Sequence, residues 1–152
     1  MNELLTAIVL WLSTNFGFPP SYDHPRVEFV PATEMVALRS KGLPAGWLLQ
    51  PGVVVGQPNQ VAEVISVYDD STKAIYLPDA WTSSKPSDLS VLVHEMVHHL
   101  QNVAGFKFAC PQKREQLAYS AQERWLGLFG HDLLHDFELD PITILVKTKC
   151  FY

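Results

Sequence analysis

The chain has 152 residues, of which 47% are hydrophobic and 18% are charged, and this is typical of one compact domain that buries roughly two-thirds of its unfolded surface. The net charge is −5 and the 11 lysines and arginines are scattered, so we expect neither nucleic acid nor an anionic membrane as a partner. The longest apolar stretch, residues 4–12, is shorter than the roughly 20 residues of a membrane-spanning helix. We therefore expect a single domain, residues 1–152, without a membrane span.

Short elements and turns are predicted for the N-terminal part of the chain. Apolar residues at three- and four-residue steps over residues 4–12 predict a helix, and the sequence Asn-Phe-Gly at residues 15–17 is its predicted stop. No positive charge precedes this stretch and no small-residue cleavage site follows it, so we do not interpret it as a signal peptide. A strand is expected over residues 26–30 and a brief helix over 33–39. Glycine and proline dominate residues 42–58, where only short strands such as 53–55 fit between the turns.

A β-hairpin is predicted next. Residues 61–68 and 74–77 are rich in β-branched and aromatic side chains, and a polar segment separates them. A small antiparallel sheet is the expected product.

Two long helices are predicted for the C-terminal part. The first covers residues 88–103, with Ser87 as its N-cap and Gly105 after its end. The second covers residues 112–129, and residues 132–152 are expected to hold one short helix or two, the second of them after a cap at Asp140-Pro141.

The first long helix contains the motif His94-Glu95-x-x-His98. Residues four apart on a helix differ by about 40° in azimuth and about 6 Å along the axis, so both imidazoles can bind one metal ion. Glu95 lies about 100° from His94, where a general base would contact a metal-bound water. Most of the surrounding helix is apolar, and burying such polar groups costs several kcal/mol unless they are paired. A metal ion is the simplest partner, and core histidines bonded to backbone carbonyls are the alternative.

A third ligand must come from elsewhere, because a catalytic zinc takes three protein ligands and leaves one position for water. Glu115 and Glu123 on the second long helix are the candidates if the two helices pack antiparallel. These glutamates differ by about 80° in azimuth and about 12 Å in height, so only one of them can reach the ion.

The paired motifs resemble those of the gluzincin branch of zinc metallopeptidases, in which His-Glu-x-x-His on one helix is followed by Glu-x-x-Ala-(Asp or Tyr) on the next. The sequence EQLAY at residues 115–119 fits the second motif. The last 90 or so residues are also similar to a group of small bacterial zincin-like domains. The resemblance implies an α+β, zincin-like fold with a small antiparallel sheet, Zn²⁺ as the cofactor and His94, His98 and Glu115 as its ligands. Tyr119 then stands where many relatives have an Asp that orients a ligand.

The function that this resemblance implies is a zinc metallopeptidase acting on a peptide or protein. Glu95 would take a proton from the zinc-bound water and return it to the leaving amine. Residues 74–77 are the expected edge strand that receives the substrate as an added strand, and Tyr76, Tyr119 and His131 are open candidates for stabilising the oxyanion. The alternatives are a zinc-stabilised binding module that cleaves nothing and a metal-dependent amidase for a non-protein substrate.

Other polar residues have simpler interpretations. His99 is expected to pack or to support the site rather than to bind metal, and His131 and His135 are expected at the surface or at a helix cap. Gln101 and Gln122 could stabilise the site, although a contact between helices is the default interpretation.

Two cysteines, Cys110 and Cys150, are present. A disulfide between them would close a loop of about 40 residues and contribute up to ~4 kcal/mol in the chain-entropy model. Such a bond favours a periplasmic or secreted protein. Free thiols and a cytoplasmic location are the alternative.

Overall fold

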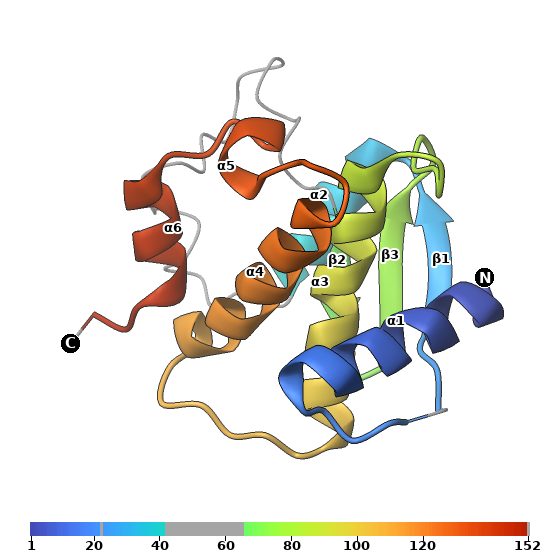
Figure 1. The fold of residues 1–152 in the computed structure, drawn as a ribbon. Coiled ribbons are helices and arrows are strands. Elements are labelled where there is room, and N and C mark those ends of the chain that lie inside the picture. The colour runs from blue at the N-terminus through green and yellow to red at the C-terminus, as the bar shows by residue number, and fades with distance from the viewer. Residues whose placement is uncertain (22, 42–65, 152) are drawn as a thin grey trace. The chain divides into compact units, whose positions relative to one another are not determined.

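The computed structural model describes residues 1–21, 23–41 and 66–151. The chain divides into two compact units, one formed by residues 1–24 and 82–152 and the other by residues 25–81. Helices and a small sheet are both present in the described residues, which confirms the α+β class (Figure 1). The expected strand at 53–55 lies outside the described residues, and one domain over the whole chain stays a prediction.

The second unit contains a mixed three-stranded sheet in the order β1-β3-β2. Its elements are β1 (Arg26–Val30), α2 (Ala32–Lys41), β2 (Val67–Asp69) and β3 (Ala74–Pro78). The predicted hairpin is confirmed, because β2 and β3 pair antiparallel. The prediction of a purely antiparallel sheet is wrong, because β1 pairs parallel with β3. Parallel neighbours need a long crossover, which the chain between β1 and β3, including α2, provides.

The expected role of residues 74–77 as an edge strand is also wrong. These residues belong to β3, which pairs with β1 from Ala74 to Pro78 on one side and with β2 from Ala74 to Tyr76 on the other. From Ala74 to Tyr76, β3 is therefore a central strand, and its backbone groups there are used within the sheet rather than left to receive a further strand. Sequence patterns showed only the local hairpin and not the distant strand that covers its other side.

The first unit begins with α1 (Asn2–Phe16). Leu5, Ile8 and Leu12 are among the residues that bury one face of this helix, as the apolar spacing predicts. The helix stops at Gly17, within the predicted stop at residues 15–17, and the φ of 72° places this glycine in the left-handed region that glycine adopts most easily.

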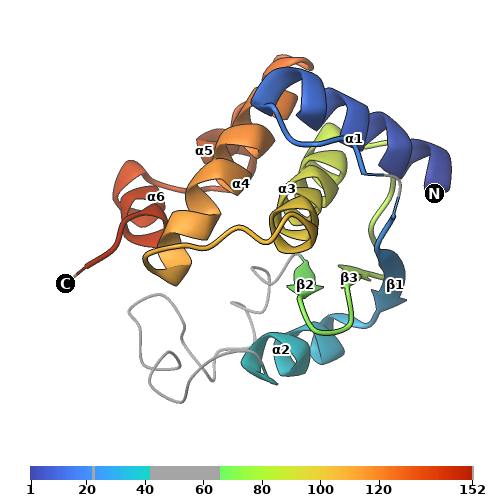
Figure 2. The same cartoon turned by 90° about the horizontal axis from the view of Figure 1, so that it is seen from below.

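The rest of this unit consists of α3 (Pro86–Val103), α4 (Pro111–Gly127), α5 (Leu133–Asp136) and α6 (Pro141–Thr148). α3 contacts both α1 and α4 and lies between them (Figure 2). Every residue of α3 from 90 to 101 is buried.

The expected N-cap of α3 is wrong. The helix begins at Pro86, with Lys85 as its N-cap, and Ser87 is already inside the first turn. Proline is well suited to this first turn because it lacks the N–H that would otherwise stay unpaired there.

The predicted disulfide between Cys110 and Cys150 is confirmed, with the two Cα atoms 5.9 Å apart. Cys110 is the N-cap residue of α4, and Cys150 follows α6. The bond therefore ties the C-terminal segment to the beginning of α4. Within the part of the chain that the structure describes, no helix combines the length and the apolar character needed to cross a membrane.

Candidate metal centre

The candidate site lies between α3 and α4, which pack antiparallel and so meet the condition for a third ligand on α4. Along α3, His94 contacts Gln122, His98 contacts Glu115 and Gln101 contacts Arg114. The partners on α4 thus follow one another in reverse order. This register brings the two histidines of α3 opposite Glu115 and Gln122 of α4.

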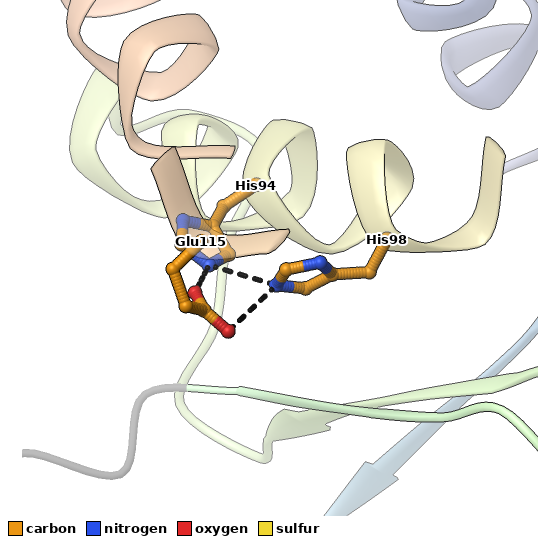
Figure 3. Close-up of side chains that lie close together, drawn as sticks. All are labelled: His94, His98 and Glu115. Carbon is orange, nitrogen blue, oxygen red and sulfur yellow. Dashed lines mark hydrogen bonds and ion pairs between the residues drawn. The ribbon is translucent and has the colours of Figure 1, made fainter. Parts of the chain in front are cut away.

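His94, His98 and Glu115 converge on one point (Figure 3). Nε2 of His94 lies 3.0 Å from Oε2 of Glu115, and Nε2 of His98 lies 3.3 Å from Oε1. The two Nε2 atoms are 3.2 Å apart. Ligands about 2.1 Å from a tetrahedral ion are roughly 3.4 Å from one another. Two imidazole nitrogens and a carboxylate oxygen are therefore close enough to share a metal ion.

The site is closed on the histidine side and more open on the glutamate side. The exposed fraction of the side chain is 11% for His94, 7% for His98 and 34% for Glu115. Glu115 is therefore the member of the donor set that is most exposed to solvent.

The donor set is electrostatically coupled. Burial by itself would lower the pKa of His98, but the charge and hydrogen bond of Glu115 outweigh it and raise that pKa. Burial likewise opposes ionisation of Glu115, yet His98 and His94 hold its pKa well below the usual value. A positive charge at this point, whether a proton or a metal ion, is therefore stabilised.

Two buried glutamines contact the outer nitrogens of the imidazoles. Oε1 of Gln122 lies 3.0 Å from Nδ1 of His94, and Oε1 of Gln101 lies 3.1 Å from Nδ1 of His98. Of the two interpretations given for these glutamines, the contacts favour support of the site over the default one. Gln122 follows Glu115 by seven residues and so shares its helix face, which is the sequence signal that points to this role.

Glu123, the alternative third ligand, has a different partner. Its Oε2 accepts a hydrogen bond of 2.7 Å from the backbone N–H of Leu133, the first residue of α5. Glu115 is the glutamate that the structure brings to the histidines.

The other residues of the motif region are distributed around this cluster. Glu95 is buried, with 6% of the residue exposed. The ring of Tyr119 packs edge-on against that of His94, with centroids 4.7 Å apart. Nε2 of His99 lies 2.7 Å from the backbone carbonyl oxygen of Asp23 and is positioned to donate to it, so this histidine is part of the core, as expected.

His131 is not placed for oxyanion stabilisation. It lies beyond the end of α4, whose length from Glu115 to Gly127 is about 18 Å, and its Nδ1 pairs with Asp136 at 2.7 Å. His131 and His135 are both exposed, which confirms the surface interpretation of these histidines, and the residue that caps α5 is Asp132. Tyr76, the other candidate besides Tyr119, belongs to β3 in the second unit.

A comparison with known families gives one match. The family described as a domain of unknown function (DUF6647) matches residues 52–152, and the chain belongs to this family. No curated protein and no solved structure is similar enough to the chain to count as a match. The family description assigns no activity, so a functional proposal has to come from the site itself.

Proposed function

We propose that this member of the DUF6647 family is a zinc-dependent metallopeptidase with a zincin-like active site. His94, His98 and Glu115 hold the ion, and Glu95 is the general base. The observation that carries the proposal is the convergence of three donor atoms from α3 and α4 at one buried point.

The chemistry of the donor set supports zinc as the ion. Two imidazoles and one carboxylate form the ligand set of many catalytic zinc sites, and three protein ligands leave one position for a water or substrate. Both cysteines are joined in a disulfide, so neither completes a closed, structural site. The exposed side at Glu115 is consistent with an open fourth position.

A bound zinc ion would supply a water whose pKa falls towards about 7 and a positive charge that polarises the substrate carbonyl. Glu95 follows His94 directly and acts electrostatically on His98, so its carboxylate lies near the donor set. We assign it the transfer of a proton from the attacking water to the leaving amine. We assign Tyr119, through its contact with His94, the stabilisation of the oxyanion.

The pairing of β3 on both sides favours a second candidate. Without that edge strand, the described chain offers less support for binding a long extended peptide. A metal-dependent amidase for a smaller, non-protein substrate would use the same four groups at the metal.

The location that we propose follows from the disulfide. Bonds such as Cys110–Cys150 form and persist in oxidising compartments. We therefore place the protein in the periplasm or outside the cell.

Incubation of the zinc-loaded protein with a peptide library and a panel of non-peptide amides tests the proposal. We expect hydrolysis that a chelator stops, that added zinc restores and that Glu95→Gln abolishes. Cleavage of the non-peptide amides alone would select the amidase. Loss of stability on chelation, with no hydrolysis of any substrate, would refute both and indicate a zinc-stabilised binding module.

A further inference from the structure

The amide of Gln122 is oriented by a chain of hydrogen bonds that begins at a backbone carbonyl. The hydroxyl of Ser90 donates to the carbonyl oxygen of Ser87 at 2.7 Å. Its oxygen therefore has only lone pairs to offer Gln122, whose Nε2 donates to it at 3.2 Å. Oε1 of Gln122 must then face His94, 3.0 Å from Nδ1. Because an amide oxygen only accepts, the proton of a neutral His94 ring is held on Nδ1.

A second chain of hydrogen bonds orients Gln101 in the same way. Nε2 of Gln101 donates to the carbonyl oxygen of Arg114 at 3.2 Å, which leaves Oε1 facing Nδ1 of His98 at 3.1 Å. Nε of Arg114 also donates to this Nδ1 at 3.1 Å, and that bond needs a lone pair on Nδ1. The two neighbours of His98 thus favour opposite tautomers. With a metal ion on Nε2, the proton of a neutral His98 ring has to be on Nδ1, where Gln101 accepts it and the N–H of Arg114 has to turn away.

We propose that Gln101 and Gln122 are positioning residues that keep both imidazoles protonated on Nδ1, so that both Nε2 lone pairs point at the metal position. The inference rests on the proposed function for the identity of the ion. Both glutamines are almost fully buried, with 1% and 4% of the residue exposed. The two chains of hydrogen bonds start from carbonyl groups on different helices. With both ring protons on Nδ1, they present lone pairs on two Nε2 atoms that are only 3.2 Å apart. Such a pair of acceptors beside the Glu115 carboxylate is a preorganised cation site.

Zinc affinity tests this proposal through matched variants. Gln101→Met and Gln122→Met keep the side-chain length but remove the acceptor, and we expect each to weaken zinc binding by about 10- to 100-fold. Gln101→Glu and Gln122→Glu restore an acceptor oxygen and should bind zinc at least as tightly as the wild type. Gln116→Met changes an exposed glutamine of α4 and should leave the affinity unchanged. Methionine variants with wild-type affinity, or folded glutamate variants as weak as the methionine ones, would overturn the proposal.

A spectroscopic measurement on the wild type avoids any dependence on how the variants fold. Long-range ¹H–¹⁵N correlation spectra of the zinc-loaded protein should show a proton on Nδ1 of both His94 and His98, with zinc on Nε2. A ring of either residue that carries its proton on Nε2, or that binds zinc through Nδ1, would contradict the proposal. For His98 that result would mean that Arg114 rather than Gln101 sets the tautomer.

Failure of this inference can be told apart from failure of the proposed function. Zinc binding with the expected tautomers but without hydrolysis of any amide would refute the enzyme and leave the positioning role intact. Zinc-dependent hydrolysis that persists with unchanged zinc affinity in both methionine variants would support the enzyme and refute the positioning role.

Discussion

At the scale of single residues, Glu95 and Glu115 are two acidic groups close to the same histidines with different tasks. Both oxygens of Glu115 face the imidazole Nε2 atoms, as a ligand requires. Glu95 comes from the same helix as the histidines and points about 100° away from His94. Zinc binding and proton transfer should therefore be separable by mutation.

Glu95→Gln should keep the zinc and lose the reaction. The amide has the same size but cannot accept the proton, so we expect kcat to fall by about 10²- to 10⁴-fold while the zinc content stays at the wild-type level. Parallel assays of metal content and hydrolysis check this. Full turnover by a zinc-loaded Glu95→Gln protein would exclude Glu95 as the general base.

Tyr119→Phe tests the second catalytic assignment. The ring contact with His94 is kept and only the hydroxyl is removed. We expect kcat to fall by about 10²- to 10³-fold, as for the loss of one oxyanion-hole donor, with little change in KM, zinc affinity or melting temperature. A wild-type kcat in Tyr119→Phe would show that another group stabilises the oxyanion.

Residues of the site were predictable from the sequence to the extent that they are local. His94, Glu95 and His98 lie within one motif on one helix, where helical geometry alone fixes their relative positions. The choice between Glu115 and Glu123 as the third ligand depends on the rotation of α4 about its axis. Helical spacing alone therefore could not decide between them, and only the family resemblance selected Glu115. The spacing of seven residues places Gln122 on the same helix face as Glu115. The glutamine contacts also depend on the register between α3 and α4, which this spacing does not specify.

At the scale of elements, α4 is anchored at both ends. The disulfide holds its N-cap residue, Cys110, and Glu123 accepts from the first N–H of α5. Glu115 lies between these two anchors. The position of the third ligand thus depends on restraints that come from the C-terminal segment.

Replacing both cysteines, as Cys110→Ser/Cys150→Ser, should destabilise the protein and weaken zinc binding. The 40-residue separation corresponds to a loss of up to ~4 kcal/mol of unfolding free energy in the chain-entropy model. Urea denaturation of the metal-free proteins measures the first effect and chelator competition the second. The wild type under reducing conditions should behave like the variant. Equal urea midpoints in the oxidised wild type and the variant would contradict a structural role of the bond.

Elements with local signals were predicted more successfully than those with distant partners. The apolar spacing of α1 and the Asp140–Pro141 start of α6 located these helices. The pairing of β1 with β3 joins strands separated by a long crossover, and nothing within either strand encodes that choice. The expected substrate strand was wrong for this reason.

At the scale of the whole molecule, stability should depend on pH in opposite ways with and without zinc. In the metal-free protein, the raised pKa of His98 gives stability that is fully present below the ordinary value and is lost as the pH rises through the raised one. The lowered pKa of Glu115 gives stability that is lost only as the pH falls through that low value. The metal-free protein should therefore be most stable in mildly acidic solution.

Zinc should reverse this trend, because the ion must displace the proton from His98 before it binds. The affinity for zinc should grow as the pH rises through the pKa of His98. The stabilisation by zinc should grow with it, and it amounts to about 2.7 kcal/mol when free zinc is in hundredfold excess over Kd. Melting temperatures between pH 5 and pH 9, with zinc and with a chelator, measure both trends. If the melting temperature changed with pH in the same way with zinc and with the chelator, zinc would not bind through His98.

The metal content of three proteins tests the central claim most directly. Mass spectrometry under native conditions should find about one equivalent of zinc in the wild type and in Glu123→Ala, whose altered residue contacts α5. It should find none in Glu115→Ala, which loses the carboxylate that faces both histidines. Zinc that survives in Glu115→Ala and disappears in Glu123→Ala would contradict the account.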